Sequence, residues 1–399
     1  MTGSPVVDGP RACAADEFDG VVALLNRVFR EGSDQNTQTD YPLIFDRARR
    51  EYMRVVSVDG AVVAHVPVAP RGVVIDGDAF TLAIIGGTVT HPDHRHRGYA
   101  TACLRDGVRI MVERGWPVSA LWTIEPTFPF YRNSGWEAVG SQGWMYTLAA
   151  DDVARLRPSH HRITVYEPGN HEHLRAIREI HDREPLRIAR SPDEYAVLFS
   201  LPKMHTLLAF EGDDVAAYLT VGQGTNKPGL VEGGGDLRAL EALVRHARAE
   251  WPADQDLQVV LPLTPCALGD VVEAIKPGRQ RPAEEASGIG FQMMRVNDFG
   301  LLMHQVRNHL GRRSTGLRGE VCVVCQDTGE AVSLHVRDGE VEVTDERLPD
   351  AVTLRRRQLT QLVFGGHASA PPLGLHGSGA HLLDALFPIY APIWEIDHS

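Results

Sequence analysis

Two periods of hydrophobic and polar positions alternate along the first part of the chain. Apolar residues recur at helical spacing over residues 16–29 and 41–49, and we expect helices there. Runs rich in β-branched residues at 53–58 and 61–69 predict two strands of a hairpin. A longer apolar run, 81–90, predicts one continuous buried strand. Helices mixed with strands in this order predict an α/β (α+β) domain with a mixed sheet.

A basic turn follows the strand at 81–90 and leads into a helix, in which Ala100, Leu104 and Val108 fall on one apolar face. The first N–H groups of a helix have no partner within it, and the helix dipole adds positive potential there. Gly98 would let a ligand approach the backbone closely, and Arg95 supplies a full charge next to it. The segment therefore predicts a cradle for pyrophosphate.

Spacing excludes two other phosphate loops, because the turn contains neither G-x-x-x-x-G-K-[ST] nor G-x-G-x-x-G. The pattern Arg95-x-x-Gly98-x-Ala100 resembles the coenzyme A loop of the GNAT acetyltransferases. The alternative is a solvated basic turn that caps a helix. The resemblance implies coenzyme contacts from the strand end, the turn and the helix start, at Thr88, Val89, Thr90, Arg95, His96, Arg97, Gly98, Tyr99, Ala100 and Thr101.

A second motif closes this part of the chain. After an apolar strand at 118–124 comes Phe130-Tyr131-x-x-x-Gly135-Trp136, which looks like the closing motif of the GNAT fold. Between strand and motif lie Glu125 and Pro126, which the resemblance places against the pantetheine; Glu125 is equally well a surface carboxylate. Residues 1–150 are therefore predicted to form a catalytic GNAT domain.

The middle of the chain repeats the order of strands and helices of the first domain but not its basic motif. Helices are expected at 171–182 and 237–251, with two strands between them. The segment before the second helix, Val231–Asp236, has no basic residue and no Arg-x-x-Gly-x-Ala pattern. Residues 151–295 therefore look like a degenerate GNAT domain with a structural or substrate-shaping role.

Residues 296–399 change character, with a helix at 299–310, three strands and two final helices. Such a helix-plus-sheet module resembles a sterol carrier protein fold. Cys322 and Cys325 fall in a predicted strand, where residues three apart point to opposite faces. We interpret them as buried strand residues, and the clustered His91, His94 and His96 as solvated or phosphate-side groups, so no metal is expected.

Charge and composition narrow the function classes. The net charge of −12 argues against a nucleic-acid partner and permits steering of a cationic substrate. No apolar run reaches the roughly 18 residues needed to span a bilayer, and the first residues lack a secretory signal. We therefore expect a cytoplasmic protein with no membrane partner.

The three modules in this order resemble the Eis family of aminoglycoside N-acetyltransferases. The resemblance implies acetyl-CoA as donor, an aminoglycoside-like or polyamine-like amine as acceptor, and a homo-oligomer such as a hexamer. It implies that Tyr131 protonates the departing thiolate and that the terminal carboxylate, here on Ser399, helps to deprotonate the amine. Asp397 is a rival for the second role, and Tyr131 has an alternative interpretation as a packed aromatic residue.

The chemistry of acyl transfer to an amine requires the same kinds of catalytic group. An amine attacks only when neutral, so a base or a water chain must take its proton. The thioester carbonyl needs an N–H donor, expected from residues 89–91. Two other functions stay open: an acyltransferase that uses another acyl-CoA in a biosynthetic pathway, and a non-catalytic protein that binds acyl-CoA or lipid.

Overall fold

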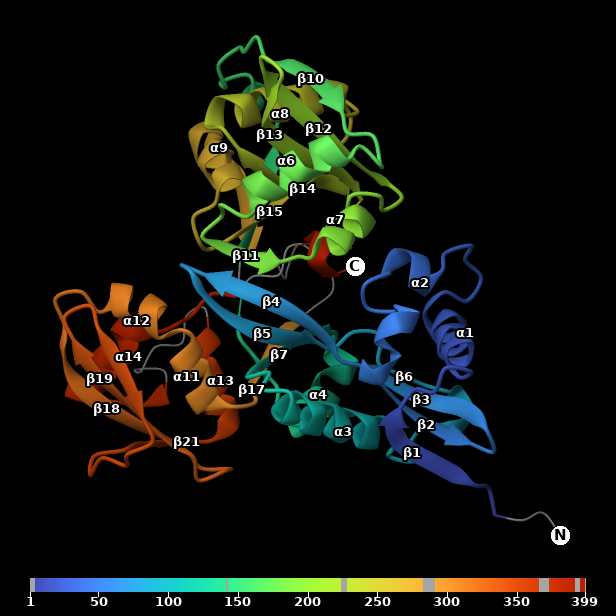
Figure 1. Ribbon diagram of the computed structural model, residues 1–399, viewed down its shortest axis with the longest axis vertical. Coiled ribbons are helices and arrows are strands. Elements are labelled where there is room, and N and C mark those ends of the chain that lie inside the picture. The colour runs from blue at the N-terminus through green and yellow to red at the C-terminus, as the bar shows by residue number, and fades with distance from the viewer. Residues whose placement is uncertain are drawn as a thin grey trace. The chain divides into compact units, whose positions relative to one another are not determined.

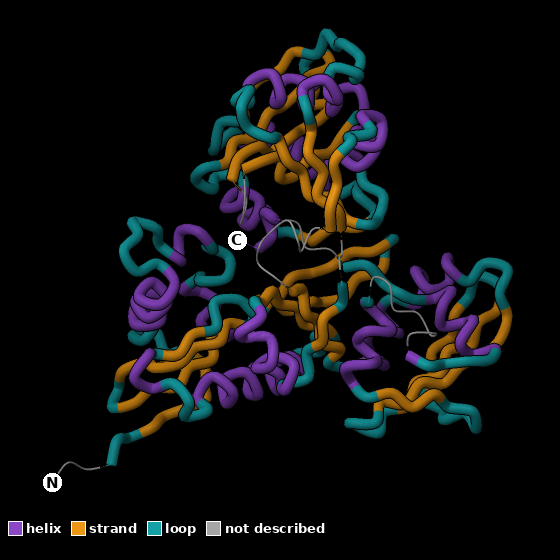
Figure 2. The backbone as a smooth tube through the Cα atoms, turned by 180° about the vertical axis from the view of Figure 1, so that it is seen from behind, coloured by secondary structure: helices purple, strands orange, loops and turns teal. Residues whose placement is uncertain are grey.

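The structure is a computed structural model that describes residues 4–140, 143–223, 228–282, 291–365, 373–391 and 395–398 (Figures 1 and 2). The chain divides into two compact units. The first unit comprises Met1–Gly72, Gly77–Val139 and Phe291–Ile389, and the second comprises Val73–Asp76, Gly140–Gly290 and Tyr390–Ser399. None of the helices in the described parts is long and apolar enough to cross a membrane.

Residues 7–138 contain the hairpin, the helix behind the basic turn and the strand after it that the sequence predicts for the first domain. The bounds of the elements in this range are β1 (Val7–Ala12), α1 (Phe18–Phe29), α2 (Thr37–Asp40), η1 (Arg47–Tyr52), β2 (Met53–Val58), β3 (Ala61–Pro67), β4 (Ala69–Ile75), β5 (Asp78–Ile84), β6 (Val89–Thr90), η2 (Pro92–His94), α3 (Tyr99–Glu113), β7 (Val118–Thr123), η3 (Glu125–Thr127), α4 (Phe128–Asn133) and β8 (Glu137–Ala138). The sequence does not predict the strand β1 or the short helix α2, and two predicted elements differ as given below. One sheet has the order β1-β2-β3-β6, and α1 and α3 both pack on β3. That sheet is antiparallel, whereas in the other sheet of this unit β7 pairs in parallel with β5 and antiparallel with the later strand at Phe291–Val296. The mixed sheet predicted for this domain is therefore confirmed in the second of the two sheets.

The helix predicted over residues 41–49 is wrong. A short helix, α2, precedes this segment, and the 3₁₀ helix η1 covers only its last residues, from Arg47. Between them, the consecutive residues Leu43, Ile44 and Phe45 are all buried. A helix would turn three consecutive side chains in three directions, so the segment buries them in a turn instead.

The continuous strand predicted over residues 81–90 is also wrong, because β5 ends at Ile84 and β6 begins at Val89. Gly87 lies between them with φ of +62°, in the left-handed region. A Cβ atom at Gly87 would lie 2.7 Å from Cζ of Phe45, so only glycine fits this crossing. Hydrophobicity identifies both strand pieces, but it does not reveal that they join different sheets.

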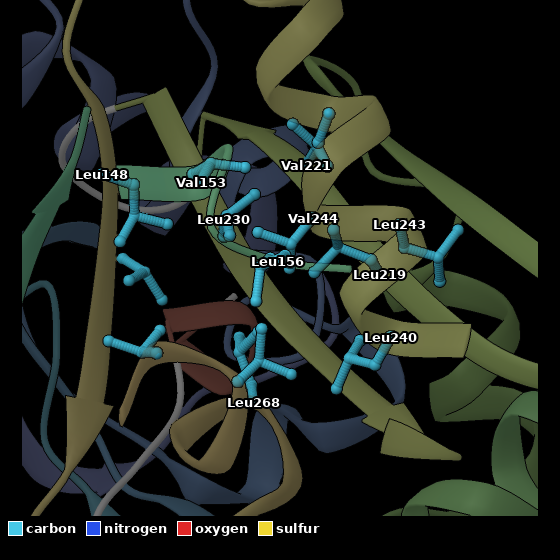
Figure 3. Packing of buried hydrophobic residues seen from close by; sticks show 14 of the residues in the cluster. Leu148, Val153, Leu156, Leu219, Val221, Leu230, Leu240, Leu243, Val244 and Leu268 are labelled. Carbon is cyan, nitrogen blue, oxygen red and sulfur yellow. The ribbon is translucent and has the colours of Figure 1, made fainter. Parts of the chain in front are cut away.

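The second unit has its own sheet, with the order β10-β12-β13-β14-β15-β9-β16. Its elements are β9 (Gly143–Leu148), α5 (Ala150–Val153), β10 (Arg162–Val165), α6 (His171–His181), β11 (Leu186–Ala189), α7 (Pro192–Leu198), β12 (Met204–Glu211), β13 (Asp214–Gln223), β14 (Pro228–Gly235), α8 (Leu237–Glu250), β15 (Leu257–Pro262), α9 (Ala267–Ile275) and β16 (Arg279–Pro282). Leucine and valine side chains from the sheet and from α8 form its core (Figure 3).

Two strands pair with a sheet outside the domain to which the predicted boundaries at residues 150 and 295 assign them. β9, from the first 150 residues, pairs with β15 and β16 in the sheet of the second unit. β17 (Phe291–Val296) falls almost wholly within the predicted middle domain, 151–295, but lies between β7 and β8 in the first unit. An apolar pattern predicts that a strand exists but does not predict which strand it pairs with.

Among its described residues, the last module contains a four-stranded sheet, β20-β19-β18-β21, and four α-helices. Its elements are α11 (Phe299–Gln305), α12 (Arg307–Arg313), β18 (Arg318–Cys325), β19 (Ala331–Arg337), β20 (Val341–Thr344), β21 (Val352–Leu354), α13 (Arg356–Phe364) and α14 (Ser378–Leu386). The 3₁₀ helix η5 (Glu395–His398) belongs to the second unit. The single helix predicted over 299–310 is broken at Val306. Asp78 explains the break, because its carboxylate accepts the backbone N–H of His309 at 2.8 Å and the Asn308 amide at 2.7 Å, at the start of α12.

A buried ion-pair network ties the end of the chain into the second unit. The Arg190 guanidinium donates to both carboxylate oxygens of Asp397, at 2.8 and 2.6 Å, and to Glu232 at 3.0 Å. All three side chains are at most 3% exposed. Burial alone would raise the pKa of Glu232, but the Arg190 charge outweighs burial and lowers that pKa to about 2. Glu232 therefore stays ionised wherever the fold is intact.

Replacing Arg190 with methionine should cost about 3–5 kcal/mol of unfolding free energy at pH 7, because two buried carboxylates lose their cation. Asp397→Asn is the control and should cost less, since Arg190 and Glu232 remain paired. The folded-state pKa of Glu232 is depressed, so this stabilisation is present above the ordinary carboxyl range and is lost as pH falls towards 2. Urea unfolding should therefore show the difference between wild type and Arg190→Met shrinking below about pH 5. A difference that stays constant with pH would contradict the assignment.

Candidate active site

The predicted cradle lies where β6 ends and α3 begins. Gly98 is the N-cap of α3, with φ of +80° in the left-handed region. A Cβ atom built at Gly98 meets no atom within 4 Å, so the backbone there faces open space. The first turn of α3 carries no acidic residue that would occupy its N–H groups. The geometry fits a diphosphate held against a helix N-terminus.

Two arginines flank this helix start, and both are exposed. The Arg95 Nε donates to the Thr90 carbonyl at 3.5 Å, and an Arg97 Nη2 donates to the Asp93 carbonyl at 3.2 Å. Neither guanidinium is neutralised by a carboxylate among the described residues, which leaves both charges for an incoming anion. His96 has φ of +61° and is exposed, while Tyr99, Ala100 and Thr101 are half-buried in the first turn.

An ion pair inside the first unit fixes the helix that carries the cradle. Arg54 on β2 donates its Nε to Asp106 on α3 at 2.5 Å, and both side chains are at most 9% exposed. At the next residue, a Cβ atom at Gly107 would lie 2.9 Å from Val68, so the helix approaches this strand region closely there. The N-terminus of α3 is therefore held rigidly relative to β6.

The strands beside the cradle separate. β5 and β7 run in parallel, and the Ile85 N–H donates to the Ala120 carbonyl at 2.9 Å. β6 then pairs with β3 instead. Of the donors expected at 89–91, the His91 N–H is already committed to the Val63 carbonyl at 2.8 Å. Because alternate residues of a strand point their N–H groups to opposite sides, the Thr90 N–H is directed away from β3.

Tyr131 lies on α4, next to Thr88 of the segment that separates from β7. Its side chain is 9% exposed and packs edge-on against Phe130, with ring centroids 4.9 Å apart. Burial raises the pKa of Tyr131, and the neighbouring Thr88 hydroxyl only partly offsets that effect. The phenol is therefore protonated at neutral pH and can donate. The ring can pack in the core while its hydroxyl donates a proton, so the interpretations of Tyr131 as a packed aromatic residue and as a proton donor are compatible.

The remaining predicted residues belong neither to the cradle nor to α4. Glu125 and Pro126 lie in η3 and are exposed, and Glu125 forms no ion pair with another described residue. Ser399 lies outside the described residues. Asp397 belongs to the second unit, where its carboxylate is buried and bound to Arg190. The alternative role of Asp397 as a free base is wrong, because deprotonating an amine requires an accessible carboxylate.

The second unit contains a similar junction that is closed to anions. β14 ends at Gly235, and Asp236 caps α8 by accepting the N–H groups of Arg238 and Ala239 at 2.9 and 3.0 Å. The carboxylate thus occupies the helix N-terminus. A Cβ atom at Gly235 would lie 2.3 Å from the Ala216 carbonyl oxygen, whereas Gly98 faces open space. The segment without a basic residue is therefore also the one in which a carboxylate already occupies the N-terminus of α8.

Candidate metal ligands do not converge in the described parts of the chain, which contain no group of three or more His, Cys, Asp and Glu side chains that could hold a metal ion. Cys322 and Cys325 are buried strand residues, as the periodicity predicts. His91 lies 2.8 Å from an Arg27 nitrogen.

The sequence analysis did not identify one titratable group: His65 on β3 is fully buried, and burial lowers its pKa to about 3. Its isolated position in a valine run gave no signal.

Comparison with known proteins agrees with this geometry. The model of a GNAT acetyltransferase domain family matches residues 10–139, from β1 to the end of α4 and β8. This range contains the cradle and Tyr131. A comparison with curated protein sequences finds no match.

Solved structures extend the likeness in fold to the whole chain. A GCN5-related N-acetyltransferase from Kribbella flavida has a TM-score of 0.73 at 18% identity, covering 98% of both chains. A probable N-acyltransferase from Enterococcus faecalis V583 has a TM-score of 0.71 at 15% identity, covering 97% of both. Eis1 from Mycobacterium abscessus has a TM-score of 0.64 at 17% identity, covering 98% of this chain and 99% of its own. Residues 10–139 are therefore a GNAT acetyltransferase domain, and the chain that carries it is an acyltransferase with an Eis-like GNAT fold.

Proposed function

We propose that the protein transfers the acetyl group of acetyl-CoA directly to a primary amine of a cationic small molecule, such as an aminoglycoside-like or polyamine-like compound. The observation that carries the proposal is Tyr131, a neutral buried phenol on α4 in the domain that also holds the cradle at Gly98. An acyl-CoA binding protein without catalysis would need the cradle alone, whereas a buried phenol that keeps its proton also supplies a donor for a departing thiolate.

Each residue then has a distinct task. The N–H groups at the start of α3, with Arg95 and Arg97, hold the diphosphate of the donor. The Thr90 N–H lies on the side of β6 away from β3 and can donate to the thioester carbonyl oxygen. The amine nitrogen forms the new C–N bond as the C–S bond breaks. The Tyr131 phenol gives its proton to the sulfur, and the amine proton passes to water or to the terminal carboxylate of Ser399, which is outside the described residues.

Charge supports a cationic acceptor only in a general way. The chain carries a net charge of −12, which favours approach of cations over long range. Within the catalytic domain, Asp40 is paired with Arg30 at 3.0 Å and so has less to offer a substrate. Asp34 and Glu125 are exposed, and neither forms an ion pair with another described residue. These two carboxylates are the groups in this domain that we expect to attract an amine.

Thiol release with a panel of donors and acceptors tests the function directly. Acetyl-CoA should react faster than longer acyl-CoA esters, and dicationic amines should react faster than neutral or acidic ones at low ionic strength. Preference for a longer acyl chain would contradict the acetyl assignment. Equal turnover of neutral amines, with no dependence on salt, would contradict the cationic acceptor.

Filling the cradle should remove donor binding. Gly98→Trp places an indole where the diphosphate would lie, so acetyl-CoA affinity by calorimetry should fall by more than about tenfold, on the order of 1.4 kcal/mol. Gly98→Asn is the matched variant, because asparagine tolerates the left-handed backbone with a smaller side chain and should lose less affinity. Unchanged melting temperatures would show that both variants fold. Full affinity in Gly98→Trp would show that the donor binds elsewhere.

Removing the phenolic proton should slow the chemical step. Tyr131→Phe keeps the ring in its packed site, so kcat should fall by about 10²–10⁴-fold while KM for acetyl-CoA changes little. Phe130→Leu changes the neighbouring ring and serves as the control for packing. If Tyr131→Phe retains full kcat in steady-state assays while Phe130→Leu loses it, the role of Tyr131 is packing alone.

A further inference from the structure

Six arginines line one pocket in the first unit, although the protein as a whole is strongly acidic. The pocket has a volume of about 730 Å³ and lies between α3, the end of α4, β17 and the start of α13. These elements appear in Figure 1 as the teal helices and the orange-red module beside them. Its cationic side chains are Arg105, Arg132, Arg295, Arg355, Arg356 and Arg357.

Arg295 is the centre of this arrangement. Its side chain is on β17 and only 9% exposed, which is an unusual position for a cation. One terminal nitrogen donates to the Asn297 side chain, and the guanidinium lies 5.5 Å from the ring centre of Trp136. The Nε atom is buried and has no hydrogen-bond partner among the described residues. Because Gly135 has no side chain, the space beside this atom stays free: a Cβ there would lie 3.1 Å from Nε.

Internal carboxylates neutralise the other arginines only in part. Glu137 is shared between Arg132 at 3.0 Å and Arg357 at 3.8 Å. Asp327, the acidic residue in the pocket lining, accepts the backbone N–H of Arg356 at 2.6 Å. Positive charge therefore exceeds negative charge throughout the pocket.

Two of the six arginines have no carboxylate at all. Arg105 on α3 and Arg355 before α13 are exposed, and neither forms an ion pair with another described residue. The Arg356 guanidinium is directed to backbone carbonyls instead, at 2.6 Å from that of Val296 and 3.2 Å from that of Asn297.

Burial has an electrostatic consequence for Arg295. Burial first, and then the nearby Arg356, lower the pKa of Arg295 to about 9. The carboxylate of Asp327 offsets only part of this effect, and a bound anion would reduce the remaining cost by pairing with both guanidinium groups. Guanidinium groups present several N–H donors in a fixed fork, which suits phosphate oxygens.

We propose that this pocket binds a phosphate-bearing small molecule at a site separate from the cradle at Gly98. None of the described residues 88–101 is in the pocket lining, which meets α3 further along, at Leu104, Arg105 and Val108. Leu104 and Val108 add an apolar wall, and the volume is large enough for a nucleotide-sized ligand rather than a lone phosphate ion. This proposal does not depend on which acceptor the enzyme acetylates.

The same chemistry has two sources, a free phosphorylated metabolite and the 3′-phosphate of coenzyme A itself. Titrating inorganic pyrophosphate and adenosine 3′,5′-bisphosphate into the full chain saturated with coenzyme A separates them. A separate site should give saturable heat under these conditions. No binding in the presence of coenzyme A, together with binding in its absence, would assign the pocket to the coenzyme and overturn the proposal.

Variants then locate the site. The double variant Arg105→Gln/Arg355→Gln changes two exposed residues and should weaken the probe by at least tenfold while affinity for coenzyme A is unchanged. Arg109→Gln, on the same helix but outside the pocket lining, is the matched control and should leave probe affinity unchanged. Arg295→Gln should act like the double variant if it folds. Equal probe affinity in the double variant and in the control would overturn the proposal.

Discussion

The separation of β6 from β7 is the constraint on which the catalytic domain depends. A parallel pairing of β5 and β7 that continued past Ile85 would use the backbone groups on both sides and leave no opening between the strands. Instead, the chain crosses at Gly87 to pair with β3, and the close contact of that glycine with Phe45 holds the crossing. The Thr90 N–H, the start of α3 and Tyr131 all owe their positions to this one departure from regular pairing.

Sequence reasoning predicted the parts of the site that lie close together along the chain. The turn from His91 to Gly98 and the helix behind it carry their signal in consecutive residues, and α3 begins one residue after Gly98. The strand break at Gly87 was missed because apolar side chains look alike whichever neighbour they face. The paired state of Asp397 was missed for a related reason, since its partner Arg190 is 207 residues away.

Net charge is a poor guide to local charge in this protein. A value of −12 describes the field at a distance, yet one pocket concentrates six arginines from four elements. Only Arg355, Arg356 and Arg357 are adjacent in sequence, and such a triplet usually lies on a solvated surface. Arg295 gives no signal in its strand pattern, because it alternates with apolar residues as an exposed residue would. Its burial depends on packing between the catalytic domain and the last module.

The exchange of β9 and β17 constrains how the polypeptide can acquire its structure during synthesis. The strand that fills the gap between β7 and β8 is encoded at residues 291–296, after the entire core of the second unit. A nascent chain therefore carries an incomplete catalytic sheet, with β7 paired only on its β5 side, until about three quarters of the chain has been made. Over that interval, β7 presents an unpaired edge to other strands. Excising residues 1–150 as a module would make this transient exposure permanent, so the smallest autonomous catalytic fragment must reach beyond residue 296.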